Sequence, residues 1–189
     1  MHTIIPFERW LEYYDPATDR KSPFFGKEYN FDVYSDTIYG YYIDPAWDCI
    51  GSPTLYIKIL YADYKQRFAI FEFIGEWNDA IENDIMILKT NIINPLLKKG
   101  IQKFILIGEN VLNFHGSDDC YYEEWLEDVE DGWIAAINFR DFVYEEWQKY
   151  RIDWYINFGG NLEIPDWRTY TPQQLYEKVN KIISYRLSM

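Results

Sequence analysis

The stretch from Asn78 to Glu109 constrains the fold of this chain more than any other. Its first part repeats apolar residues three or four positions apart, which lines one face of a helix, at Ile81, Ile85, Leu88, Ile92 and Leu96. Asn78 suits an N-cap, and Gly100 suits the C-terminal end of a helix. The apolar segment Phe104–Ile107 that follows is typical of a strand buried on both faces. We predict a helix over residues 78–100 and a buried parallel strand that ends at Gly108-Glu109.

The chain ahead of this unit has the pattern of strands. β-branched and aromatic residues lie between turn residues, which predicts strands at Phe31–Ser35, Ile38–Ile43 after an Asp36-Thr37 turn, Thr54–Tyr61 and Arg67–Ile74. Because short turns join neighbouring antiparallel strands, residues 31–74 are predicted to form an antiparallel meander. Residues 1–30 are predicted to form a short amphipathic helix at Pro6–Tyr14 and an arm that wraps the domain.

Helices and strands alternate after residue 100. Apolar spacing and turn residues predict helices at Tyr121–Val129, at 141–150 with Phe142, Val143 and Trp147 inward, and from Thr171 onward, and strands at Trp133–Ile137 and Trp154–Phe158. Thr171-Pro172-Gln173-Gln174 is a capping box with proline at the first helical position. Strands alternating with helices favour parallel pairing. The predicted fold is α/β: one domain over residues 1–189 with a mixed sheet, an antiparallel meander at 31–74 and βαβ alternation over 75–189.

Composition narrows the classes of function. The 189 residues carry 31 acidic against 18 basic side chains, a formal net charge of −13. Such a surface repels phosphate backbones and anionic lipid, which argues against nucleic acid and membranes and favours a basic protein partner. The chain lacks an export signal and a long apolar run, so we expect a soluble cytoplasmic protein.

Neither a metal site nor a cofactor is predicted. The chain has two cysteines, Cys49 and Cys120, 71 positions apart, and two histidines, His2 and His115. That spacing fits no metal site or disulfide framework, and a single histidine beyond the N-terminus cannot build a histidine-rich site. Gly159-Gly160 lacks the spacing of a phosphate-binding loop.

One resemblance to a known family rests on the order of elements. A strand pair precedes G-E-W-N-D-A-I (Gly75–Ile81), then K-F-I-L-I-G (Lys103–Gly108), then alternating helices and strands. This order over Thr54–Phe158 resembles the STAS-like architecture of anti-sigma-factor antagonists. The resemblance implies protein–protein regulation. That family carries a phosphorylated Ser or Thr in a loop after the central strand, where this chain offers only Ser117, farther along and among acids, so no phosphosite is transferred.

The carboxyl end of the predicted strand 104–107 is the first candidate for a site, because α/β sheets place ligands where parallel strands end. Glu109, His115, Asp118 and Asp119 follow this strand. A pair of these carboxylates with the histidine has the chemistry of a small hydrolase. The competing interpretation is helix capping by Asp118 and Asp119 and an ordinary surface histidine.

The second candidate is the acidic run 118–131, which contains eight carboxylates and no base. Aromatic residues are interleaved with the acids, and the predicted partner-binding residues are Tyr121, Tyr122, Glu123, Glu124, Trp125 and Glu127. The competing interpretation is a solvated helix face whose apolar side packs on the core.

Three hypotheses of function follow from these patterns. The first is a non-enzymatic interaction or regulatory module that uses an acidic, aromatic-rich surface. The second is a small carboxylate-dependent hydrolase with its site at the end of strand 104–107. The third is a carbohydrate-binding module, because 20% of the residues are aromatic and exposed Trp and Tyr rings bind sugars.

Overall fold

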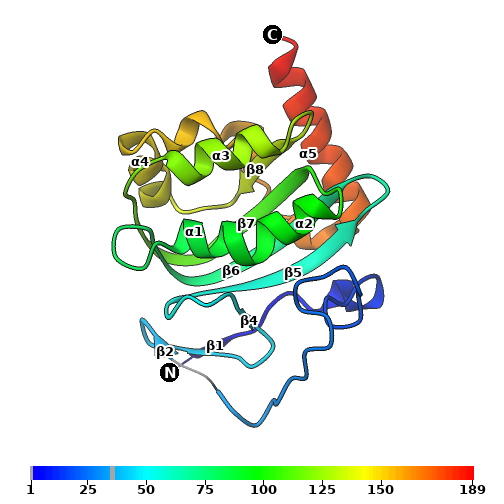
Figure 1. Cartoon of the computed structure of the whole chain (residues 1–189), viewed down its shortest axis with the longest axis vertical. Helices are drawn as coiled ribbons and strands as arrows, with labels where there is room; N and C mark the ends of the chain where they lie inside the picture. Colours follow the sequence, from blue (N-terminus) through cyan, green and yellow to red (C-terminus); the bar gives the residue numbers. More distant parts are fainter. Residues whose placement is uncertain (1, 35–36) are drawn as a thin grey trace.

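A five-stranded mixed sheet forms the centre of the molecule (Figure 1). The computed structural model describes residues 2–34 and 37–189. The strand order is β4-β5-β6-β7-β8, with bounds Asp48–Cys49, Leu55–Asp63, Phe68–Asn78, Lys103–His115 and Trp133–Ile137. β4, β5 and β6 pair antiparallel, whereas β6, β7 and β8 pair parallel. The predicted α/β class with a mixed sheet is therefore confirmed.

The predicted meander is wrong over residues 31–43. The segment after Asn30 is a turn, because Asn30 Oδ1 accepts a hydrogen bond from Asp32 N at 3.1 Å and Asn30 O accepts one from Val33 N at 3.2 Å. Asparagine side chains commonly replace strand pairing with such local turns. The predicted Asp36-Thr37 turn falls partly outside the described residues.

The predicted strand Ile38–Ile43 is instead a tight hairpin. β2 (Thr37–Ile38) and β3 (Tyr41–Ile43) pair antiparallel around Tyr39 and Gly40, whose φ angles are +48° and +83°. Two consecutive positive φ angles match the twist that a two-residue hairpin requires. β1 (His2–Ile4) adds to β3 in parallel, so these strands form a separate three-stranded sheet.

The helix predicted at 78–100 begins six residues later. Asn78 is the last residue of β6, and α1 begins at Asp84. The buried Asp79 carboxylate replaces the predicted cap, because its Oδ1 accepts hydrogen bonds from Ile85 N and Trp77 Nε1, both at 2.9 Å. Ile81, predicted on the core face, is 81% exposed.

The helical segment changes its turn type before it reaches proline. It comprises α1 (Asp84–Leu88), a π-helical turn η2 (Lys89–Ile93) and α2 (Asn94–Lys98). A proline ring clashes with a regular α-helical turn ahead of it, and a π-turn is wider. The helical segment thus continues past Pro95 and ends near Gly100, whose φ is +94°.

β7 is three times longer than predicted. The sequence of Phe104–Ile107 marks only its buried start, and the strand continues to His115. The continuation pairs with β6 from Ile74–Asn110 to Asn78–His115, with two register shifts. A long neighbouring strand supplies the hydrogen bonds, and this long-range cause leaves little trace in the local sequence. Gly108 lies within the strand, where a Cβ would meet the Phe139 ring at 2.3 Å.

The C-terminal half is close to prediction, with two exceptions. The confirmed elements are α3 (Cys120–Asp128), β8 (Trp133–Ile137), α4 (Asp141–Lys149) and α5 (Pro172–Leu187). Thr171 and Gln174 form the predicted capping box. The predicted strand Trp154–Phe158 is instead a 3-10 turn (Ile152–Trp154) followed by one bridge, between Ala135 and Asn157. Phe142 is exposed rather than inward.

Each face of the sheet carries its own core. Helices α1 to α4 cover one face, and α5 with the N-terminal arm covers the other (Figure 1). The helix predicted at Pro6–Tyr14 is a single 3-10 turn, Arg9–Glu12. Its Trp10 is buried against Trp167, with ring centroids 5.6 Å apart, and donates to Tyr170 O at 3.0 Å. Tertiary contacts of Trp10 therefore help to hold the arm on this face.

Candidate interaction surface

The four residues predicted for a hydrolase lie in separate environments. Glu109 points toward the α5 face, where it accepts hydrogen bonds from Trp167 Nε1 at 2.5 Å and Asn138 Nδ2 at 3.1 Å and pairs with Arg168 at 2.8 Å. His115, at the end of β7, lies 3.0 Å from Asn113 Nδ2. Glu109 is thus held in a structural network well before the strand ends.

Asp118 and Asp119 lie at the start of α3 and serve local contacts. Asp118 Oδ1 accepts a hydrogen bond from Cys120 N at 3.1 Å. Asp119 occupies the N-cap position, yet its side chain makes no cap and accepts from Tyr155 OH at 3.1 Å. Across residues 2–34 and 37–189, no hydrogen bond or ion pair connects any two of Glu109, His115, Asp118 and Asp119. The predicted acid–base group is therefore not assembled.

A buried carboxylate that the sequence analysis missed lies on β6. Glu72 is 2% exposed and accepts a hydrogen bond from Phe7 N at 2.8 Å, with Arg168 at 3.9 Å. Burial raises the pKa of Glu72 to about 7, although the Phe7 amide and Arg168 oppose that shift. The sequence indicates this buried carboxylate, because Glu72 is the single acid in the mostly apolar segment R-F-A-I-F-E-F-I (residues 67–74).

Helix α3 buries two of the aromatic residues predicted to contact a partner. Tyr122 donates a 2.6 Å hydrogen bond to Asp79, and Trp125 packs edge-on against Phe104 with ring centroids 5.3 Å apart. Both side chains are fully buried, and Val129 continues the same face. Tyr122 and Trp125 are therefore core residues and do not line an interaction surface, whereas Tyr121 is half-buried.

The acids of α3 lie on two sides of this buried face. On one side, Glu124 and Asp128 hold the buried Lys89 Nζ at 2.8 and 2.7 Å. Burial alone would lower the pKa of Lys89, but its hydrogen bonds to Asp128 and Glu124 raise it above its ordinary value. These two acids therefore fasten α3 to η2.

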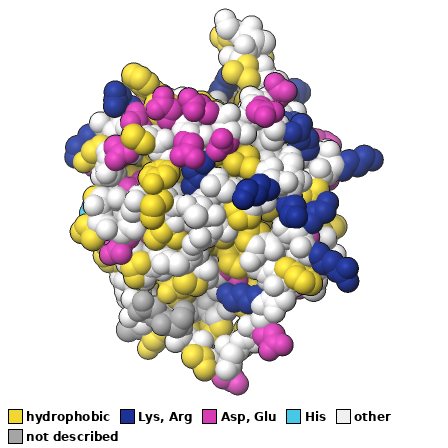
Figure 2. All heavy atoms as spheres, in the orientation of Figure 1, with side chains coloured by type: hydrophobic (Ala, Val, Ile, Leu, Met, Phe, Trp, Pro, Cys, Tyr) yellow, Lys and Arg dark blue, Asp and Glu magenta, His cyan; other side chains and the backbone are white. Residues whose placement is uncertain are grey.

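On the other side, Asp119, Glu123 and Glu127 follow one another at four-residue spacing, which places them in one row along the helix. We call this row the outer acidic row. Glu123 and Glu127 are exposed, and no base among the described residues forms an ion pair with either. Figure 2 shows acidic side chains gathered over α3.

An exposed tryptophan lies beside the start of this row. Trp154 is 67% exposed, whereas the other seven tryptophans are buried. The neighbouring Tyr155 donates a hydrogen bond to Asp119. Arg151 links Trp154 to the outer acidic row, because Arg151 Nε lies 3.5 Å from Asp119 and the Arg151 guanidinium lies 5.7 Å from the Trp154 ring. With seven of eight indoles in the core, the high Trp content does not supply the row of rings that a sugar site requires.

Two further features of the described residues bear on the kind of site. Within the described parts of the chain, no group of three or more His, Cys, Asp or Glu side chains is arranged to hold a metal ion. None of the described helices is long and apolar enough to cross a membrane.

Neither a protein-family model nor a curated protein matches the sequence. Among solved structures, the chain is similar to the anti-sigma factor antagonist SpoIIAA in its unphosphorylated form, with a TM-score of 0.45 and 9% identity over 66% of this chain and 96% of that one. It is also similar to the Bacillus cell fate determinant SpoIIAA in the phosphorylated form, with a TM-score of 0.37 and 9% identity over 55% and 91%. The order of elements expected from Thr54 onward is present in the structure as β5, β6, α1, β7, α3 and β8, and likenesses at these TM-scores carry no conclusion about this chain. Ser117 lies just ahead of α3.

Proposed function

We propose that this protein is a non-enzymatic interaction module that binds a basic segment of a partner protein through the outer acidic row and Trp154. The observation that carries the proposal is the unpaired state of Glu123 and Glu127 within the described structure, in a row whose first residue, Asp119, is linked through Arg151 to the exposed indole of Trp154. Tryptophans are common hot spots of protein interfaces, and complementary charge steers association and selects the partner.

The arrangement of charge favours a basic partner. Like charges at four-residue spacing destabilise a helix by a few tenths of a kcal/mol per pair, and Glu127 near the C-terminal end of α3 also opposes the helix dipole. The acids that face Lys89 stabilise the fold, whereas Glu123 and Glu127 make no such contribution. A lysine- or arginine-rich segment would neutralise them and gain in rate of association from the net charge of −13.

Charge reversal tests this proposal. Protein with Glu123→Lys and Glu127→Lys is compared with wild type as bait in the source cell extract. Partners that bind through the outer acidic row are lost from the variant and are released from wild type by added salt. Trp154→Ala should weaken the same partners by at least about tenfold, because exposed tryptophans are common hot spots.

The matched control carries Glu145→Lys and Glu177→Lys, which reverses two exposed acids on α4 and α5 and gives the same net charge. It should retain the partners. Partners that survive reversal of Glu123 and Glu127, or that are lost equally from the control, contradict the assignment of this surface.

A further inference from the structure

A second charged surface lies where the turn between β5 and β6 meets the end of α2. Four exposed basic side chains gather there, two from each element: Lys65 and Arg67, Lys98 and Lys99. We call these four residues the basic cluster. Among the described residues, no acid forms an ion pair with any of them. Figure 2 shows Lys and Arg side chains gathered on the side of the molecule where α2 and the β5–β6 turn end in Figure 1.

Main-chain contacts hold the two halves of the basic cluster together. Arg67 O accepts hydrogen bonds from Gln102 N at 2.9 Å and Lys103 N at 3.0 Å, and Arg67 Nε donates to Gly100 O at 3.0 Å. The turn is thereby joined to the segment that follows α2. Arg67 also has a φ of +66°, a conformation that glycine adopts with less strain. The chain thus keeps like charges near one another, and an acidic partner surface would relieve their repulsion.

The basic cluster and the outer acidic row lie on different sides of the molecule. Glu124 and Asp128 fasten one side of α3 to η2, whereas the row follows the other side of α3, where Asp119 contacts Tyr155. The cluster lies beyond η2, at the end of α2. Because η2 and the body of α3 stand between the two surfaces, one molecule cannot bring them into contact with each other.

We propose that the basic cluster of one molecule binds the outer acidic row of a second copy of this chain. This inference rests on the proposed function, because it names the partner of the same acidic row. The two surfaces are opposite in charge and lie on different sides of one molecule. The contact is therefore heterologous, and it adds copies head to tail. Complementary charges fix the orientation of such a contact and disfavour like-charged pairings.

The proposed contact is weak and sensitive to salt. Exposed ion pairs contribute little individually, and each copy carries a net charge of −13. At about 0.1 M salt the screening length is about 10 Å, so distant charges of the two copies repel little, whereas ion pairs in direct contact persist. Trp154, beside the row, offers its ring to a lysine or arginine of the next copy. Self-association should therefore increase with protein concentration and be lost at high salt.

Sedimentation velocity of the purified protein tests the proposal. In about 0.1 M salt, the average mass of wild type should rise above that of one chain as the protein concentration increases. In about 1 M salt, where the screening length is about 3 Å, the mass should return to that of one chain. A mass that stays at one chain at every concentration in about 0.1 M salt overturns the proposal.

Charge reversal on either surface should abolish self-association. The row variant carries Glu123→Lys and Glu127→Lys, and the cluster variant carries Lys98→Glu and Lys99→Glu. Each variant keeps one native surface, so an equimolar mixture should form pairs of one row variant and one cluster variant and should stop at two chains. The net charges become −9 and −17, so overall charge cannot draw the variants together. A variant that self-associates alone, or a mixture that stays at one chain, overturns the proposal.

Matched controls separate the position of the charges from their sum. Glu145→Lys with Glu177→Lys also gives −9, and Lys178→Glu with Lys181→Glu, on exposed positions of α5, gives −17. Both controls should self-associate as wild type does. If the controls lose self-association as fully as the row and cluster variants do, net charge governs the association and the assigned surfaces are wrong.

Failure of this inference is distinguishable from failure of the proposed function. If wild type stays at one chain while partners from the cell extract depend on Glu123 and Glu127, the second copy is ruled out and the proposed function stands. If neither self-association nor any extract partner depends on these two residues, the proposed function fails as well.

Discussion

The main-chain N–H of Phe7 donates a 2.8 Å hydrogen bond to Glu72 Oε2, across 65 positions of sequence. Glu72 lies in the middle of β6, the central strand of the five-stranded sheet. One buried carboxylate therefore connects the N-terminal arm to the sheet.

Stability should increase as the pH falls from 8 to about 5. Burial raises the pKa of Glu72 and Asp79 to about 7 and that of Asp84 to about 6, above ordinary values of 4.5 and 3.8. A raised pKa in the folded state means that the folded protein binds the proton more tightly than the unfolded chain. The stabilisation is complete below the unfolded pKa and is lost as the pH rises through the folded one. Urea unfolding at several pH values measures this slope.

Glu72→Gln is the control for that slope. Glutamine keeps an acceptor for Phe7 N–H and does not titrate, so the variant should gain less stability on acidification than wild type does. A free energy of unfolding that stays constant or falls between pH 8 and 5.5 contradicts the expectation.

Lys89→Met should destabilise the protein by about 1–2 kcal/mol. The substitution keeps most of the apolar volume but removes hydrogen bonds to Glu124 and Asp128, and bonds to charged groups contribute about 1.5–3 kcal/mol. Both acids are about half exposed, so water compensates part of the loss. Urea unfolding measures the change, and Lys98→Met, on the exposed side of α2, should remain within about 0.5 kcal/mol of wild type. Equal effects of the two substitutions would show that the Lys89 pairs do not stabilise the fold.

Gly132→Ala should cost about 3 kcal/mol, whereas Gly116→Ala should cost about 1 kcal/mol. A Cβ at Gly132 would lie 1.7 Å from Gln102 O, a main-chain atom directly ahead of β7 that cannot move without disturbing the sheet. A Cβ at Gly116 would lie 2.3 Å from the half-buried Tyr150 ring, which can rotate. Thermal and urea unfolding compare the two, and the reverse order would contradict this account.

Glu127→Lys should raise stability by about 0.5 kcal/mol, because it places a cation near the C-terminal end of α3 and relieves repulsion by Glu123. Urea unfolding compares it with Glu145→Lys, which lies within α4. A more stable variant that loses its partner would show that Glu127 serves binding and not folding. Marked destabilisation would instead give Glu127 a structural role.

Local patterns predicted α3, β8 and the α5 capping box because spacing and cap residues act within a few positions. The same spacing would also have placed Tyr122, Trp125 and Val129 on one buried face of α3, at i, i+3 and i+7. The prediction that Tyr122 and Trp125 contact a partner is wrong because the helical period turns both side chains toward the core.

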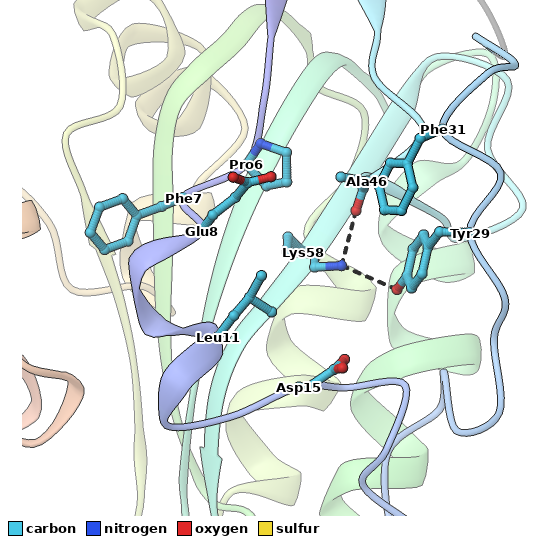
Figure 3. A pocket seen from close by; sticks show the side chains of 9 residues that line it. All are labelled: Pro6, Phe7, Glu8, Leu11, Asp15, Tyr29, Phe31, Ala46 and Lys58. Atoms are coloured by element: carbon cyan, nitrogen blue, oxygen red, sulfur yellow. Dashed lines mark hydrogen bonds between the residues drawn. The ribbon is translucent and has the colours of Figure 1, made fainter.

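The remaining differences have long-range causes. β7 is long because β6 beside it is long, and helix α1 begins late because Asp79 replaces Asn78 as its cap. Leu11 and Tyr29 of the arm and Lys58 of β5 line one cavity (Figure 3) although they lie far apart in the sequence, and no local pattern specifies such contacts.

The connections within the sheet also set an order in which it can form. Only the turn 64–67 separates β5 from β6, whereas residues 79–102 separate β6 from β7. The entropic cost of closing a loop rises with its length, so pairing of β5 with β6 costs less entropy than pairing of β6 with β7. Lys58 and Glu72 face each other in that hairpin. The strands that carry these two buried titratable side chains are thus expected to meet early, before α5 and the arm shield them from water.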